Sequence, residues 1–228
     1  MKLTLSKTRP EAAGVTSFIF EADRPVSWTA GQYLHYTLPH PQMDDRKNKR
    51  WFTISAAPSE GHIMVTTRFA GEKSSSFKRA LFAMQPGDVI EAEGPEGDFV
   101  VSDTDREYIF IAGGIGITPF RSILVDAKAR GVKLHVTLLY ANRDQEIPFK
   151  QELEDLAEAN PDLKVRLVVA PAKIDQALLK PVLGEVHNPL VYVSGPEPMV
   201  EAMEQELKEL GVPEDSIVGD FFPGYTAV

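Results

Sequence analysis

The stretch AGGIGITPF, residues 112–120, constrains the fold of this chain more than any other part of the sequence. It follows Tyr108–Ala112, an apolar run typical of a buried parallel strand, and leads into a segment with the pattern of a helix. Its three glycines permit a sharp backbone turn or the close approach of a ligand. A strand, a glycine-rich turn and a helix in this order predict one unit of a parallel α/β sheet.

The end of this stretch has the residues of a helix start. Thr118 is a favourable N-cap, and Pro119 suits the first helical position because it has no N–H group. The helix is expected to end at Arg130, just before Gly131. Free amides at a helix start attract anions, so the turn is either a phosphate-binding loop or a purely structural turn. It matches neither the dinucleotide pattern G-x-G-x-x-G, because Pro119 replaces the third glycine, nor the Walker pattern, which needs a lysine.

The two halves of the chain differ in pattern. The first half has short β-rich runs at 15–22, 32–38, 52–55, 62–68 and 89–93, with one helical segment at 75–84. The second half alternates strands at 108–112, 133–140, 164–169 and 190–194 with helices at 119–130, 149–159, 174–183 and 197–210. We therefore predict an antiparallel β-barrel domain at residues 1–103 and an α/β parallel-sheet domain at residues 104–228.

Composition narrows the classes of function. The 228 residues are 43% hydrophobic and carry a net charge of -9, which argues against a nucleic-acid partner. No apolar run approaches the roughly 20 residues that span a bilayer, and no signal peptide is evident, so a cytoplasmic location without membrane insertion is expected. The chain has no cysteine and only five scattered histidines, so we predict no metal site. Redox chemistry would then need an organic cofactor.

Three loops are expected to meet at one edge of the parallel sheet. Ligands of such sheets bind beyond the carboxyl ends of the strands. The glycine-rich turn lies at one such end, Asn142 and Arg143 follow a second strand, and Ser194–Pro196 follows a later one. This convergence favours a nucleotide site.

Four separated motifs resemble, in the same order, those of the ferredoxin–NADP reductase-like superfamily of flavoenzymes. They are Arg50–Thr53, Gly71–Phe77, Gly113–Pro119 and Val193–Met199. The resemblance covers nearly the whole chain. It implies a flavin-binding barrel followed by a nicotinamide-nucleotide domain, with FAD and NAD(P)H as cofactors.

The first two motifs imply the flavin contacts. Arg50–Thr53 resembles R-x-Y-S/T, so Arg50 would pair with the flavin pyrophosphate, Phe52 and Trp51 would pack against the ring, and Thr53 would lie near N5. Gly71–Phe77 resembles a G-x-x-S loop in which Ser74 or Ser75 holds the second phosphate, unless the serines only cap the helix. The flavin contacts predicted from these motifs and the adjoining strand are Arg50, Trp51, Phe52, Thr53, Thr67, Gly71, Ser74 and Ser75. A pyrophosphate site favours FAD over FMN, although some relatives hold FMN.

The last two motifs imply the nucleotide contacts. Gly113–Pro119 resembles GG-x-G-x-TP, and Val193–Met199 resembles C-G-P-x-x-M with Ser194 in place of the cysteine beside the nicotinamide. The predicted nucleotide contacts are Gly114, Gly116, Ile117, Thr118, Pro119, Asn142, Arg143, Ser194, Gly195, Pro196 and Met199. Near the C-terminus an acidic residue precedes an aromatic one, and Phe222, or else Tyr225, is expected to pack near the flavin.

The resemblance implies an enzyme that transfers hydride from NAD(P)H to FAD, with Thr53 and Ser194 as the catalytic neighbours. Electrons would pass to a separate acceptor such as ferredoxin or flavodoxin. The basic run Arg46–Arg50 would steer an acidic carrier, unless it is only a solvated loop. Two alternatives stay open: a reductase of free flavin, and a regulatory subunit without turnover. The choice between NADH and NADPH also stays open, because Arg143 would attract a 2′-phosphate and Asp144 would repel it.

Overall fold

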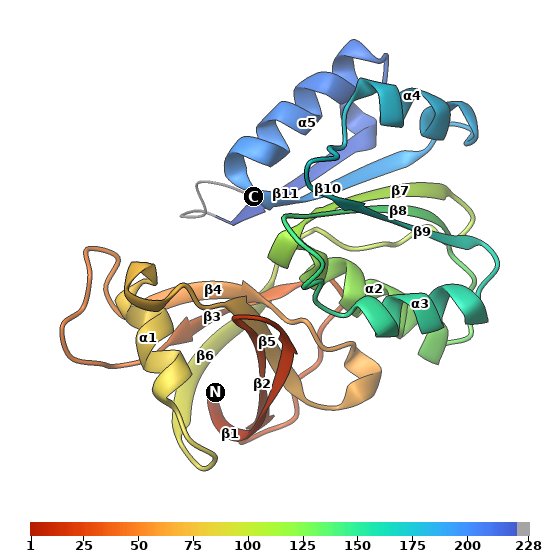
Figure 1. The fold of residues 1–228 in the computed structure, drawn as a ribbon. Coiled ribbons are helices and arrows are strands. Elements are labelled where there is room, and N and C mark those ends of the chain that lie inside the picture. The colour runs from red at the N-terminus through yellow and green to blue at the C-terminus, as the bar shows by residue number, and fades with distance from the viewer. Residues whose placement is uncertain (223–228) are drawn as a thin grey trace.

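A computed structural model describes residues 1–222, which form two sheets (Figure 1). The first is a six-stranded antiparallel sheet with the order β4-β3-β6-β1-β2-β5. Its strands are β1 (Lys2–Ala12), β2 (Val15–Ala22), β3 (Tyr33–Thr37), β4 (Lys49–Thr53), β5 (Ile63–Arg68) and β6 (Val89–Glu96), and helix α1 (Ser76–Ala83) lies between β5 and β6 in the sequence.

This sheet curls so that its two edge strands approach each other. Ser55, just after β4, donates its N–H to the carbonyl of Met64 in β5 at 2.9 Å. Buried side chains such as Phe18, Leu34 and Phe77 fill the interior. The prediction of an antiparallel barrel carrying a helix is confirmed.

The second sheet is parallel, with five strands in the order β11-β10-β7-β8-β9. Its strands are β7 (Glu107–Gly113), β8 (His135–Asn142), β9 (Leu163–Val169), β10 (Leu190–Pro196) and β11 (Ile217–Phe222). Its helices are α2 (Ile117–Ala129), α3 (Lys150–Ala159), α4 (Gln176–Gly184) and α5 (Glu197–Glu209). Figure 1 shows α2 and α3 on the face toward the barrel and α4 and α5 on the opposite face.

Alternate residues of β7 explain how helices cover both faces. Tyr108 and Phe110 belong to the core on the α2 and α3 side, whereas Ile109 and Ile111 belong to the core under α4 and α5. A strand buried on both sides reads as a continuous apolar run, which is why it was recognisable. The predicted α/β parallel-sheet domain is confirmed. Residues 97–106, which join the two sheets, contain no helix or strand, and the boundary at 103/104 stays a prediction within them.

Helix α2 is fixed to the barrel through its first turns. Arg121, only 1% exposed, donates to the carbonyl of Ser55 at 2.9 Å and pairs with Glu60 and Glu152. The neighbouring Ser122 hydroxyl donates to the carbonyl of Ala56 at 2.8 Å. Because α2 begins at the glycine-rich turn, these bonds set the position of that turn relative to the barrel.

Candidate functional site

The carboxyl ends of three neighbouring strands form the candidate nucleotide site. β7 ends at Gly113, β8 at Asn142 and β10 at Pro196, and the three strands are adjacent in the order β10-β7-β8. From β7 the chain runs outward to β8 and β9, then returns to the other side of β7 as β10. Open α/β sheets bind ligands where the strand order reverses in this way. The glycine loop, residues 113–118, lies at that point.

The start of α2 differs from the prediction. Gly114–Gly116 forms a short 3₁₀ turn that runs directly into the helix, so the N-cap is Gly116 and not Thr118. Thr118 instead lies inside the first turn, where its hydroxyl donates to the carbonyl of Ile115 at 3.2 Å. Pro119 is the third helical residue. The N–H groups of the first turn have no partner within the helix, so a proline at this position costs no hydrogen bond. The helix end at Arg130 and Gly131 is as predicted.

The three glycines of the loop have different structural roles. A Cβ atom at Gly113 would lie 2.2 Å from the sulfur of Met199, and one at Gly116 would lie 2.2 Å from the carbonyl oxygen of Ser194. These two allow close packing within the protein. Gly114, with a φ of +52°, has no atom within 4 Å of such a Cβ, so its side faces open space. Gly114 is therefore the glycine that leaves room for a ligand.

Two buried polar side chains flank the glycine loop and make no hydrogen bond of normal geometry among the described residues. Ser194 on β10 is 0% exposed and its hydroxyl is unpaired, and Asn142 on β8 is 5% exposed with an amide that meets only the Tyr140 hydroxyl, outside normal hydrogen-bond geometry. Buried polar groups nearly always have partners, so such orphans need an explanation. They fit a ligand rich in hydroxyl, amide and phosphate groups, as a nicotinamide nucleotide is. Arg143 is exposed beside them, whereas Ile117, Gly195 and Pro196 are buried.

On the barrel, Arg50 and Phe52 lie on the face of β4 that packs against α1. Arg50 is 4% exposed, and its guanidinium lies 5.7 Å from the centre of the Phe77 ring. The Phe52 ring packs 5.8 Å from the same ring. Trp51 lies on the other face of the strand, 44% exposed and against His35. The structure therefore brings Arg50 and Phe52 together but does not bring Trp51 to them.

The Arg50 guanidinium is paired with a carboxylate of the protein itself, that of Asp44. Its Nη2 donates to Oδ1 of Asp44 at 2.6 Å, and its Nη1 donates to the carbonyls of Arg46, Lys47 and Lys49. The other oxygen of Asp44 accepts the N–H of Ser76, the first residue of α1, at 2.9 Å. These donors suit negatively charged oxygen, so they fit a flavin phosphate once Asp44 moves away. Sequence reasoning missed Asp44, because nothing in its local pattern marks the contact.

The other predicted flavin residues lie around α1 and the barrel strands. Ser75 is the N-cap of α1 and accepts the N–H of Lys78, while the Ser74 hydroxyl accepts the N–H of Ala70 at 2.7 Å. Both hydroxyls therefore cap the backbone. Thr53 and Thr67 are buried in β4 and β5, and Gly71 begins a 3₁₀ turn with a φ of +58°.

The C-terminal strand places a carboxyl group beside Ser194. Asp220 pairs in register with Ser194 across β10 and β11, and burial raises the pKa of Asp220 to about 6. Phe222 ends β11, where its backbone pairs with Pro196. Tyr225 lies outside the described residues. The acidic residue of this segment thus stands next to Ser194, the serine predicted to lie beside the nicotinamide.

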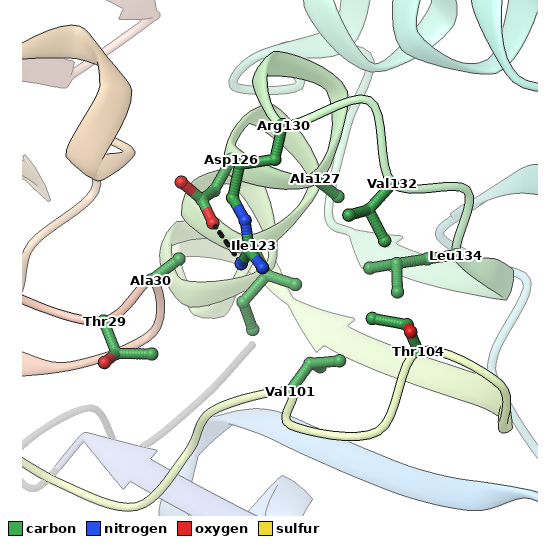
Figure 2. A pocket seen from close by; sticks show the side chains of 10 residues that line it. All are labelled: Thr29, Ala30, Val101, Thr104, Ile123, Asp126, Ala127, Arg130, Val132 and Leu134. Atoms are coloured by element: carbon green, nitrogen blue, oxygen red, sulfur yellow. Dashed lines mark hydrogen bonds and ion pairs between the residues drawn. The ribbon is translucent and has the colours of Figure 1, made fainter.

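A small pocket lies away from this site (Figure 2). It has a volume of about 30 Å³, room for one or two water molecules, between the barrel and the far end of α2. Its polar lining includes Thr29 and Thr104 and the Asp126–Arg130 ion pair, and none of the predicted cofactor residues lines it. Residues 1–222 hold no group of three or more side chains suited to a metal. None of the helices described is long and apolar enough to cross a membrane.

Comparisons with known proteins agree with this geometry. Residues 110–205 match the model of the oxidoreductase NAD-binding domain family. Flavohemoprotein A of Dictyostelium discoideum is 26% identical over 96% of this chain and 59% of its own length. The ferredoxin reductase component of a 3-ketosteroid-9-alpha-monooxygenase from Mycolicibacterium smegmatis is 31% identical over 92% of this chain and 58% of its own. The chain thus spans less than two thirds of these relatives.

Solved structures share the whole two-domain fold. Ferredoxin–NADP⁺ reductase from Plasmodium falciparum superposes with a TM-score of 0.82 at 16% identity, covering 97% of this chain and 95% of that one. The FAD/NAD-binding domain of a nitric oxide dioxygenase from Vibrio cholerae gives 0.80 at 21% identity, with 97% and 98% covered. The expected fold and an oxidoreductase domain for a nicotinamide nucleotide are confirmed.

Proposed function

We propose that this chain, which shares the fold of ferredoxin–NADP⁺ reductase and matches an oxidoreductase NAD-binding domain, is an NAD(P)H-dependent flavin oxidoreductase of that superfamily that passes electrons to a separate acceptor. The barrel would bind FAD at Arg50 and the start of α1. The glycine loop would bind NAD(P)H. The observation that carries the proposal is the unpartnered buried hydroxyl of Ser194 on one side of Gly114, with the buried Asn142 on the other.

The flavin, when bound, would supply the redox chemistry, taking up a hydride and releasing electrons singly. The protein's contribution is position. Ser194 and Asn142 would donate hydrogen bonds to the nucleotide, and Gly114 would admit it close to the backbone. Phe52 would pack against the flavin ring and Thr53 would offer a hydroxyl, while the Arg121 contacts hold the two domains in register.

Relatives supply the reason for a separate acceptor. The Mycolicibacterium smegmatis protein is named as a reductase component of an oxygenase, and a structural neighbour is described as transferring electrons from pyridine nucleotides to [2Fe-2S]. We place the docking surface at Arg46, Lys47 and Lys49, which are exposed beside the flavin residues of β4. An acidic carrier such as ferredoxin or flavodoxin fits this basic run.

One observation favours a second candidate, a reductase that uses flavin as a passing substrate. Asp44 already bonds to the donors that would hold the flavin phosphate. A flavin that must displace a carboxylate binds more weakly. Retention of yellow flavin through gel filtration distinguishes the two, because a substrate flavin separates from the protein.

The nucleotide site is tested by Asn142→Ala, with Asn160→Ala as its matched control. Asn160 already donates its amide to the carbonyl of Leu134 at 3.1 Å, away from the glycine loop. Asn142→Ala is expected to weaken NAD(P)H binding about ten-fold while flavin content stays unchanged. Equal NAD(P)H affinity in Asn142→Ala and the wild type would contradict the proposed site.

A further inference from the structure

We propose that Asp44 competes with the flavin phosphate for Arg50 and the first amide of α1, and so sets how tightly this chain holds phosphorylated flavins. The inference rests on the proposed flavin site. It concerns a residue outside the four motifs, in the 39–48 loop between β3 and β4. Figure 1 shows this loop extending beside α1.

The Asp44 carboxylate occupies both kinds of donor that a phosphate would use. Oδ1 accepts from the Arg50 Nη2 at 2.6 Å and Oδ2 accepts from the Ser76 amide at 2.9 Å. The buried Nε of Arg50 has no partner in the described structure. Nε and Nη2 form the edge of a guanidinium that grips two oxygens of one anion, and here only half of that edge is used. The Arg50 guanidinium and the Ser76 amide could therefore bind more anionic oxygen atoms than the Asp44 carboxylate supplies.

The 39–48 loop is attached to α1 at a second point. His40 shares a hydrogen bond with the Ser76 hydroxyl at 2.9 Å, and the same hydroxyl accepts the N–H of Asp44 at 2.9 Å. The loop contains no helix or strand. It is held by a few polar contacts, most of which converge on Ser76 and Arg50. A loop fastened in this way can be released when another anion takes those contacts.

The charge of Asp44 makes the competition effective. Partial burial acts to raise its pKa, but the Ser76 amide and Arg50 outweigh burial and lower the pKa to about 2. The carboxylate is therefore ionised at any physiological pH. A phosphate would have to replace it, because two anions at one guanidinium repel each other. The competition applies only to flavins that carry phosphate.

The test compares Asp44→Ala, Asp44→Asn and the control Asp45→Ala. Asp45 lies exposed in the same loop and has no hydrogen bond or ion pair in the described structure, so its replacement removes equal charge without touching Arg50. Flavin-free protein is titrated with FAD, FMN and riboflavin, and binding is followed by flavin fluorescence. Melting temperatures show that each variant is folded, and Asp44→Asn serves if Asp44→Ala does not fold.

We expect the Asp44 variant to bind FAD and FMN about ten-fold to a hundred-fold more tightly, with riboflavin affinity and Asp45→Ala unchanged. Weaker or equal FAD binding in a folded Asp44 variant overturns the inference. If neither wild type nor variant binds any flavin, the proposed function fails instead. The inference is then decided with inorganic pyrophosphate: tighter binding by the Asp44 variant, seen as a shift of the Ser76 amide resonance, supports it, and equal binding overturns it.

Discussion

The α-carbon of Gly116 lies so close to Ser194 that an added Cβ would stand 2.2 Å from the Ser194 carbonyl oxygen and 2.5 Å from its carbonyl carbon. The start of α2 and the end of β10 are thus packed backbone to backbone. Their relative position shapes the candidate nucleotide site. The sequence motif alone assigns this glycine to close contact with a ligand, but the structure gives it a neighbour within the protein.

Gly116→Val is therefore expected to separate the two loops. Its side chain cannot fit against the Ser194 backbone, and a displacement of about 1 Å at a reacting site can reduce catalysis about a hundred-fold. We expect the KM for NAD(P)H to rise about ten-fold or more, with the flavin spectrum unchanged. Gly184→Val is the control, because Gly184, like Gly116, has no positive φ, but an added Cβ there would have no atom within 4 Å. Loss of flavin from Gly116→Val would show that the loops are assigned to the wrong cofactors.

Ser194→Ala should separate function from stability. The buried Ser194 hydroxyl has no partner, so its removal is expected to leave the free energy of unfolding equal or about 1 kcal/mol higher in the flavin-free protein. Reduction of flavin by NAD(P)H, measured by stopped flow, should slow about ten-fold or more. Ser122→Ala is the opposite case, because that buried hydroxyl donates to Ala56 and its loss should cost about 1 kcal/mol. Unchanged flavin reduction in Ser194→Ala would remove Ser194 from the catalytic residues.

Charge reversal tests the acceptor surface. Arg46→Glu with Lys47→Glu is expected to slow reduction of an acidic carrier about ten-fold at low salt, and the difference should shrink as ionic strength rises. Turnover with ferricyanide should change little. Lys49 is left intact because it pairs with Glu93 at 2.6 Å. An equal loss of rate in both assays would indicate a damaged flavin site. No loss in either assay would mean that the basic run Arg46–Arg50 is only a solvated loop.

The raised pKa of Asp220 predicts that the stability of the protein depends on pH. Its pKa is raised by burial from 3.8 to about 6, so between these values the folded protein binds more protons than the unfolded chain. Stability then falls as pH rises through that window. Urea unfolding of the flavin-free protein should show a loss on the order of 1–2 kcal/mol from pH 4 to 6.5 that Asp220→Asn lacks. The same pH profile in both proteins would mean that Asp220 titrates normally.

The fold was predictable where one pattern dominated. The apolar run of β7 and the alternation that follows it indicated a parallel sheet. The patterns missed β1, whose only buried side chains are Leu3 and Leu5 among charged and polar neighbours. They also missed β11, which contains Gly219 and Asp220 and becomes a strand by pairing with β10. Pairing of this kind depends on tertiary context, which propensity does not contain.

The candidate site was predictable as a set of strand ends but not as a set of contacts. Asn142, Ser194 and the glycine loop could be placed at one sheet edge because parallel strands share a direction. The predicted N-cap of α2 was wrong, because a 3₁₀ turn at Gly114–Gly116 leads into the helix two residues earlier than expected. The Asp44–Arg50 pair depends on the path of an irregular loop, which no residue pattern specifies.

The most direct test of the proposed function is an anaerobic titration of the purified protein with NADH and with NADPH, followed by the absorption spectrum of the flavin. We expect that FAD copurifies or can be restored to the flavin-free protein, and that the visible absorption of the oxidised flavin bleaches with about one equivalent of one nucleotide. Ser194→Ala should bleach more slowly than the wild type. A protein that neither retains nor takes up flavin, or whose bound flavin stays oxidised with both nucleotides, would show that the chain is not an NAD(P)H-dependent flavin oxidoreductase.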